Sequence, residues 1–233
     1  MRDANGNKVI DDDPNSGNYG YPIVDNQTGK IGDINPDWIA GVNTGFTFKN
    51  MLTLSATFDI RHGGDIWNGT KGALTFFGRT PNTISASETP SASNNYLRYD
   101  TAHVFEGVKG HLDADGNLVL GDGTNDTKVA LDQSWFQGNG GGFGSQSEDF
   151  VEDGSYVKLR ELSLTYSFSK KCFTGTPIAG LDVSFIGRNL WLKTKYTGVD
   201  PETSLTGSGN SQGMDYFNMP NARSIGFSLK LTL

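Results

Sequence analysis

Cysteine, long apolar runs and basic charge are all scarce in this sequence of 233 residues. The single cysteine, Cys172, has no partner for an internal disulfide. It follows Lys170 and Lys171 in a stretch typical of a turn, so an incidental turn residue is the simplest interpretation of the lone thiol. No run of 18 or more apolar residues occurs, which excludes a transmembrane helix but not membrane strands, whose apolar residues alternate with polar ones.

The shortage of basic charge argues against a nucleic-acid-binding protein. The net charge is −7, whereas neutralising phosphates requires clustered Lys and Arg. The excess of acid is concentrated between His62 and Phe150, where 11 acidic residues face 5 basic ones. Most of the negative charge is therefore predicted to lie in one connecting segment.

The residues that are abundant favour strands. Glycine occurs 31 times, aromatic residues reach 11%, and long stretches of helix formers at helical spacing are missing, so we expect an all-β chain. Five segments alternate apolar and polar residues with a period of two; in "LTLSATFDI", Leu52, Leu54 and Phe58 share one face. The alternation predicts a strand hairpin at 37–61 and strands at 155–168, 181–192 and 223–233, with loops at 1–36 and 62–150.

The length and spacing of these segments favour a membrane barrel over a soluble sandwich. Segments of roughly 9 to 12 residues suit tilted membrane strands, and their polar face carries mostly Ser, Thr, Asn and Gly. The connections alternate between short and long, with a tight hairpin at Lys49-Asn50 and a connection of almost ninety residues after it. Short turns on one side and long loops on the other are typical of outer-membrane barrels. The alternation shifts near Arg160, which predicts a β-bulge there.

Aromatic residues are predicted to form a girdle at each membrane interface. If the Lys49-Asn50 turn is periplasmic, four rings lie at the periplasmic ends of the strands: Phe46, Phe48, Tyr166 and Phe168. Trp38 and Trp191 then lie at the outer ends, and "TGVDPE" after Tyr196 begins an external loop. Five strands cannot close a barrel, and open strand edges are not tolerated in lipid, so we expect the chain to be part of a larger barrel.

Four ordered blocks resemble a known family. The blocks are "IGDINPDWIAGVNTGFTFKNMLTLSATFDIRHGGDIWNGT", "SYVKLRELSLTYSF", "GRNLWLKTKYTGVDPE" and a terminal alternating strand. They are similar to the C-terminal end of SusC/RagA-type TonB-dependent outer-membrane transporters. The resemblance implies that 1–233 is the C-terminal part of such a receptor: the last five antiparallel strands of a transmembrane barrel of about 22 strands with long extracellular loops, without the plug domain.

The same resemblance implies a function and partners. It implies an outer-membrane importer of large nutrients, oligosaccharides or peptides, in a Gram-negative, Bacteroidetes-type cell. A SusD-like surface lipoprotein would cover the barrel, and TonB-ExbB-ExbD would supply energy through the N-terminal part of the protein. Two alternatives remain open from the residues themselves. One is a secreted β-sandwich that binds carbohydrate, and the other is a passive outer-membrane pore.

Three stretches could be interpreted as ligand-binding loops, but each has a simpler interpretation. In "DANGNKVIDDD", four side chains could offer oxygens for calcium: Asp3, Asn5, Asn7 and Asp11. However, Lys8 and Pro14 stand where a glycine and a final carboxylate are expected. An Asn-Gly turn is the simpler interpretation, as is an Asp-Gly turn in "LDADGNLVL". "GNGGGFG" suggests a phosphate loop, yet no helix follows to present its amides, so we expect a flexible loop. We expect neither metal nor cofactor.

No arrangement of residues indicates an enzyme. The three histidines lie at no metal-ligand spacing, and no nucleophile motif occurs. The best candidates for ligand or lid contacts are aromatic residues in the long connections, which we expect to be exposed, since flat rings stack on sugars. The alternative is that these rings pack the loop against its neighbours. The candidates are Trp67, Tyr96, Tyr99, Trp135 and Phe136.

Overall fold

The chain forms two compact units. The sheet unit contains Gly32–Asn68 and Val151–Leu233, and the loop unit contains Met1–Ile31 and Gly69–Phe150. No helix of the described residues is long and apolar enough to cross a membrane. The computed structural model describes residues 1–83, 100–144, 147–207 and 212–233, so Tyr96 and Tyr99 lie outside the described residues.

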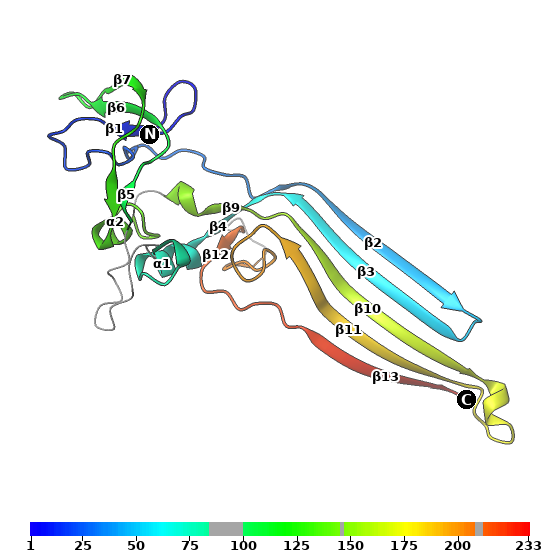
Figure 1. Cartoon of the computed structure of the whole chain (residues 1–233). Helices are drawn as coiled ribbons and strands as arrows, with labels where there is room; N and C mark the ends of the chain where they lie inside the picture. Colours follow the sequence, from blue (N-terminus) through cyan, green and yellow to red (C-terminus); the bar gives the residue numbers. More distant parts are fainter. Residues whose placement is uncertain (84–99, 145–146, 208–211) are drawn as a thin grey trace, which may run out of the picture. The chain divides into compact units, whose positions relative to one another are not determined.

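Five long strands form one antiparallel sheet in the sheet unit (Figure 1), which confirms the predicted fold class. The order across the sheet is β13-β11-β10-β3-β2, so that β3, β10 and β11 are central. The strands are β2 (Pro36–Phe48), β3 (Leu52–Gly63), β10 (Tyr156–Ser169), β11 (Gly180–Thr194) and β13 (Ser224–Thr232).

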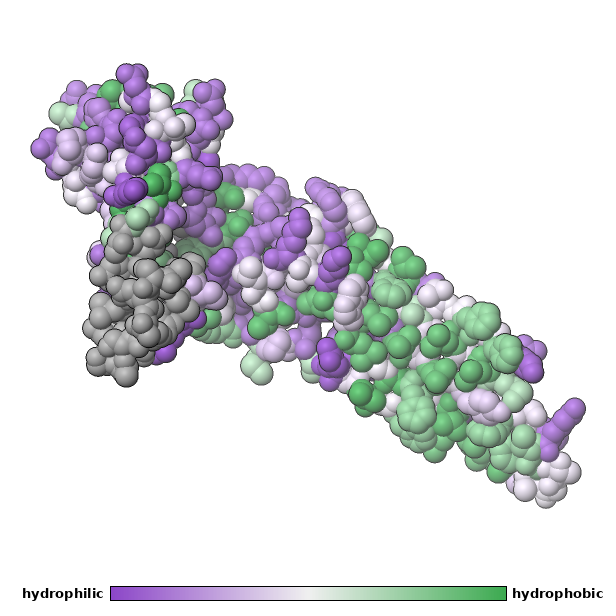
Figure 2. Space-filling view, viewed as in Figure 1, coloured by the Kyte–Doolittle hydropathy of each residue, from purple (hydrophilic) through white to green (hydrophobic). Residues whose placement is uncertain are grey.

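The register keeps apolar residues on one face of this sheet. Leu164 lies opposite Leu54 on β3 and Phe185 on β11, and Phe185 in turn lies opposite Phe227 on β13. These side chains are 42% to 58% exposed, so the described residues leave this face largely uncovered. Figure 2 shows apolar residues gathered over the part of the sheet towards the β2–β3 turn.

Hydroxyl groups pair across the strands on the opposite face. The Ser55 and Ser163 hydroxyls lie 2.6 Å apart, and those of Thr165 and Ser184 lie 2.8 Å apart. Thr57 donates to the side-chain amide oxygen of Asn43 at 2.8 Å. One exposed apolar face and one polar face joined by hydrogen bonds follow from the period-two alternation of the sequence.

A bulge interrupts β10 where the sequence predicted it. The pairing with β3 shifts between Leu159 and Glu161, which leaves Arg160 as an extra residue against β3. The pairing with β11 shifts at the same place, where Asn189 and Leu190 stand opposite Arg160. The predicted two-residue turn after β2 is one residue longer, because Phe48 pairs with Leu52 around a turn at 49–51. Lys49 and Asn50 adopt positive φ angles of 50° and 53°, which a tight turn of this hand requires.

The edge strand β13 is shorter than its neighbour. It pairs with β11 only from Thr232 to Ser224, opposite Gly180 to Arg188. The last residues of β11 therefore have no partner on β13. A small second sheet of the same unit has the order β12-β4-β9 and consists of β12 (Met214–Asp215), β4 (Asp65–Asn68) and β9 (Val151–Asp153).

The segment predicted as one long loop supplies most of the loop unit. Short strands form two sheets, β1-β6-β7 and β5-β8, around buried residues such as Val9, Ile10 and Val129. The strands are β1 (Val9–Asp11), β5 (Asp100–His103), β6 (Val108–Leu112), β7 (Leu118–Thr124) and β8 (Val129–Leu131); the helices are α1 (Gly69–Phe76) and α2 (Gln133–Gln137), with 3₁₀ turns at Pro81–Thr83 and Ser147–Phe150.

Two turns with nearly the same sequence, "DANGN" and "DADGN", have the same hydrogen bonds. Asp3 accepts from the backbone amides of Asn5 and Asn7, and Asp113 accepts from those of Asp115 and Asn117, at 2.8 to 2.9 Å. The glycine of each turn has a positive φ angle, 85° or 80°. Each aspartate thus organises its own turn. A hydrogen bond from the Asn7 side chain, with those from the backbone, lowers the pKa of Asp3, and hydrogen bonds from the backbone and side chain of Asn117 lower that of Asp113.

The glycine-rich stretch after α2 is closely packed, which differs from the flexible loop expected. Gly142 donates its backbone amide to the Gly72 carbonyl of α1 at 3.0 Å. A Cβ atom on Gly142 would lie 2.3 Å from the Gly72 Cα. Glycine is needed at these positions because the backbones of Gly72 and Gly142 are in contact. A sequence rich in glycine does not distinguish such a contact from a flexible loop.

Candidate functional site

Charged side chains gather where the start of β10 meets the connection between β11 and β13. Lys158 is only 2% exposed, and its Nζ atom donates to the Asp200 Oδ2 atom at 2.9 Å. The same ammonium group donates to Glu202. A buried ammonium group is tolerated when carboxylates surround it, and here two carboxylates of one short loop do so.

Arg160 joins this loop to β3. Its Nε atom donates to the Asp59 Oδ2 atom at 2.6 Å, and its Nη1 atom donates to the Glu202 Oε2 atom at 3.0 Å. Arg160 is the extra residue of the bulge against β3. Its contacts with Asp59 and Glu202 place its side chain on the polar face, beside that of Lys158. We name Asp59, Lys158, Arg160, Asp200 and Glu202 the ion clamp.

The sequence "VDPE" presents both loop carboxylates to β10. The Asp200 side chain accepts from the Glu202 backbone amide at 3.0 Å, a turn in which Pro201 occupies the middle position. Thr203 donates its hydroxyl to the Asp200 carbonyl at 2.9 Å. Asn221, near the other end of the connection, donates to Asp200 at 3.0 Å and to Glu202 at 3.3 Å. Both ends of the connection are therefore tied to the ion clamp.

The environment of Glu202 keeps its carboxyl group ionised. Burial alone would raise the pKa of Glu202, but hydrogen bonds from Arg160 and Lys158 and their positive charges outweigh it and lower the pKa to about 2. Glu202 is therefore ionised across the physiological range of pH.

Two further contacts hold the connection beyond the ion clamp. Tyr196 is 4% exposed and donates its hydroxyl to the Asp215 Oδ2 atom at 2.5 Å. Burial and this hydrogen bond raise the pKa of the Tyr196 hydroxyl. Thr197 donates its backbone amide and its hydroxyl to Glu152 on β9, each at 2.7 Å. Tyr196 thus anchors the connection from within, whereas Trp191 on β11 is 46% exposed.

The aromatic residues predicted as ligand contacts lie in different surroundings. Trp67 on β4 is half-buried and stacks on Tyr216, with ring centroids 6.5 Å apart. Trp135 and Phe136 are 9% and 7% exposed, so the expectation that these rings are exposed is wrong for both. Trp135 stacks on Tyr21 with ring centroids 5.1 Å apart. Trp135 and Phe136 form the buried side of the five-residue helix α2.

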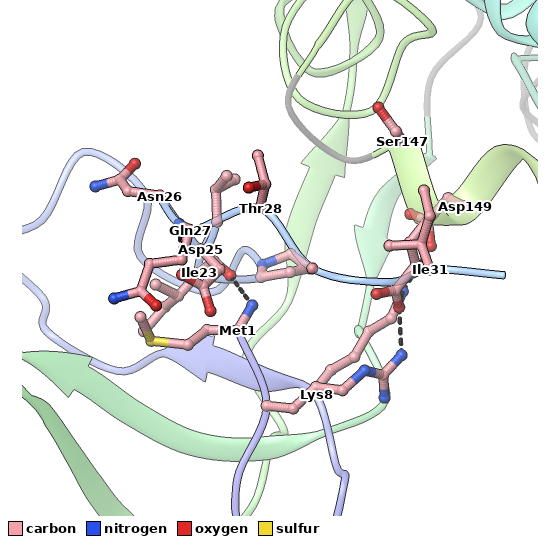
Figure 3. Close-up of a pocket in the computed structure, with 15 residues that line it drawn as sticks. Met1, Lys8, Ile23, Asp25, Asn26, Gln27, Thr28, Ile31, Ser147 and Asp149 are labelled. Atoms are coloured by element: carbon pink, nitrogen blue, oxygen red, sulfur yellow. Dashed lines mark hydrogen bonds and ion pairs between the residues drawn. The ribbon is translucent and has the colours of Figure 1, made fainter.

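The loop unit also contains a cavity of about 320 Å³ lined by both polar and apolar residues (Figure 3). Its wall includes Asp25, Asn26 and Thr28, whose side chains could hydrogen-bond a sugar or a peptide. The basic residues of the wall are engaged: Lys8 binds Asp149 at 2.6 Å, and Arg2 binds Glu148. The cavity is a candidate for a neutral polar ligand.

The ion clamp could not be predicted from the sequence, because its residues are far apart in the chain and follow no spacing rule. Two signals were available. Lys158 and Arg160 stand on a strand face that is otherwise mostly Ser and Thr, and "VDPE" places two carboxylates two positions apart in a turn. The hydrogen bonds and ion pairs of the ion clamp fix the β11–β13 connection onto the polar face.

Comparisons with known proteins agree with this fold. No protein-family model matches the chain. The TonB-dependent receptor P3 of Formosa agariphila is 32% identical over 87 residues, which is 35% of the chain and 9% of that receptor. The RagAB peptide importer in its closed-closed state superposes with a TM-score of 0.50 at 18% identity, over 99% of the chain and 20% of the RagAB chain.

The open-open state of RagAB gives a TM-score of 0.48 at 19% identity, over 86% of the chain and 17% of the RagAB chain. The chain thus spans at most a fifth of the length of the proteins it matches. The structural likeness is one of fold.

Proposed function

We propose that this chain, a segment of a SusC/RagA-type TonB-dependent transporter, forms part of the wall of an outer-membrane barrel that imports large nutrients. In the proposed protein about 22 strands close the barrel, a SusD-like lipoprotein covers it, and TonB-ExbB-ExbD supplies energy through an N-terminal plug. The cargo is a peptide or an oligosaccharide, and the cell is of the Bacteroidetes type.

The observation that carries the proposal is the exposed apolar face of the five-stranded sheet. Phe46, Phe185 and Leu229 are 57% to 67% exposed on three different strands, and they belong to one continuous face. A soluble protein rarely exposes so large an apolar patch, whereas a membrane barrel turns that face to lipid. A secreted sandwich would bury it beneath a second sheet, which the described residues do not provide.

The free edges of the sheet support a larger closed structure. Within the described residues, β2 and β13 each pair with a strand on one side only. Their outer backbone groups would be unsatisfied in hydrocarbon, so further strands are needed on both sides. The polar face, lined by Ser, Thr and Asn side chains, then borders an aqueous interior.

The ion clamp fixes a loop at the entrance of the proposed barrel. It holds the β11–β13 connection against the polar face, which is the interior side in a barrel. The connection therefore narrows the entrance at the end opposite the short turns, and it does so as a fixed element. Of the predicted ligand contacts, Trp67 belongs to the sheet unit, and the exposed part of its half-buried ring would contact cargo. Trp135 and Phe136 are buried and support the loop unit in which they lie.

The test uses the full-length protein in its own outer membrane. Uptake of labelled peptides and oligosaccharides is compared in cells with the gene, without it, and with the gene but without TonB. Uptake that requires both the gene and TonB is the expected result. Uptake that requires the gene but not TonB would identify a passive pore, and recovery of the protein in the soluble fraction would contradict the membrane barrel.

A further inference from the structure

Basic side chains gather at the end of the five-stranded sheet that carries the short turns. Lys49 lies in the β2–β3 turn, and Lys170 and Lys171 lie in the β10–β11 turn; all three are exposed. The two turns are far apart in the sequence but adjacent in space, because Ser167 donates its backbone amide to the Met51 carbonyl at 2.7 Å. We name the three lysines the lysine rim.

The lysine rim is basic within a chain whose net charge is −7. No acidic residue occurs within 44–54 or 165–181, and the next one, Asp182, lies opposite Lys230 in the register of β11 and β13. Among the described residues, no ion pair involves Lys49, Lys170 or Lys171. The positive charge of the rim is therefore not neutralised by neighbouring side chains.

Large apolar side chains adjoin the rim on one face of the sheet. Phe48 is 52% exposed and Phe168 is 36% exposed. The Lys49 Nζ atom lies 5.3 Å from the centre of the Phe48 ring, so the ammonium group and the apolar surface are in contact. A free anion would use only the charges, whereas an amphiphile with an anionic head and acyl chains would use both.

We propose that the lysine rim binds the phosphate headgroups of anionic phospholipids, whose acyl chains lie on the adjoining apolar face. The proposal rests on the proposed function, since it needs the strands to stand in a membrane with their short turns at one surface. Basic residues next to an anionic leaflet are attracted to it, and the attraction increases with each lysine. The rim would fix the depth of the barrel at that leaflet.

The test uses the full-length transporter in a zwitterionic detergent. Short-chain phosphatidylglycerol is titrated into the wild-type protein, and bound lipids are counted by native mass spectrometry. The variant K170Q/K171Q removes two rim charges, and K193Q/K195Q removes two exposed charges at the other end of β11 as a matched control. We expect K170Q/K171Q to weaken binding by roughly fivefold per lysine, with the control unchanged.

Specific outcomes would overturn the proposal. Equal phosphatidylglycerol binding by K170Q/K171Q and wild type would do so, as would equal binding of phosphatidylcholine. Displacement of the lipid by inorganic phosphate would identify a simple anion site in place of a lipid site. If K170Q/K171Q does not fold, Lys49→Gln replaces it with an expected fivefold loss. A wild-type protein that forms no detergent-stable barrel would contradict the proposed function as well, which separates the two failures.

Discussion

The Lys158 Nζ atom lies 2.9 Å from the Asp200 Oδ2 atom, and the two side chains are only 2% and 7% exposed. Residues 42 positions apart, one on a strand and one in a loop, thus share a buried ion pair. Such a pair adds little stability compared with apolar packing, but removing one partner leaves the other charge buried without compensation. The connection between β11 and β13 depends on this pair for its position.

Lys158→Met should release the connection from the sheet. The change leaves Asp200 and Glu202 without their shared ammonium group and should cost about 3–5 kcal/mol. Limited proteolysis of the full-length protein should then cut within 195–207, which should resist cleavage in the wild type. Lys195→Met, an exposed control, should behave as wild type, and K158M/D200N/E202Q should regain part of the resistance because no unpaired charge remains. Full resistance of Lys158→Met would contradict the clamp.

The contribution of Glu202 to stability should disappear at low pH. Its folded pKa of about 2 lies below its ordinary value of 4.5, so the folded state favours the ionised form. The stabilisation is therefore fully present above about pH 4.5 and is lost as the pH falls towards about 2. Urea midpoints of wild type and Glu202→Gln should differ by a constant amount from pH 7 to pH 5 and converge below that. A difference that grows on acidification would show that the sign is wrong.

Gly142→Ala should disrupt the loop unit. The added methyl group would meet the Gly72 backbone at 2.3 Å, and neither backbone has a flexible side chain to move aside. Overpacking of this kind typically costs about 1–3 kcal/mol. Gly17→Ala is the control, because a Cβ atom there would meet nothing within 4 Å. Hydrogen exchange of α1 should increase in Gly142→Ala alone, and equal exchange in both variants would contradict the close contact.

A charge on the apolar face should be far more harmful than one on the polar face. Phe227 and Ser228 are neighbours on β13 and point to opposite sides of the sheet. Phe227→Arg places the guanidinium group in lipid at a cost of about 2–4 kcal/mol, whereas Ser228→Arg places it in the aqueous interior. The amount of folded barrel in outer membranes should fall for the first variant only. Equal losses for both would contradict the assignment of the faces.

The long strands and the bulge could be predicted from the sequence, because both follow from local alternation. The spacing of Leu52, Leu54 and Phe58 predicts one face of β3. The change in alternation near Arg160 predicts an extra residue there, which the pairing of β10 with β3 confirms. The same logic fails for residues 69–150, where strands of three to seven residues are too short to show a period. Their partners are chosen by contacts distant in sequence.

Neither the burial of Trp135 nor the ion clamp could be predicted from the sequence, for a related reason. Both depend on which distant segment packs against a residue: Tyr21 covers Trp135, and Asp200 covers Lys158. A charged residue on a strand resembles a solvent-facing one until its partner is known. Conversely, the aspartates of "DANGN" and "DADGN" bind within their own five residues, so the simpler interpretation as turns agrees with their hydrogen bonds.

The short reach of β13 sets the depth to which the barrel can sit in a bilayer. Above Arg188, β11 continues to Thr194 without a partner on β13, a length of roughly 20 Å along the strand at about 3.4 Å per residue. Unpaired backbone groups are not tolerated in hydrocarbon, so the hydrocarbon layer must end near the level of Arg188 and Ser224. The ion clamp then stands in the water-facing zone just above that boundary, where charged groups cost least.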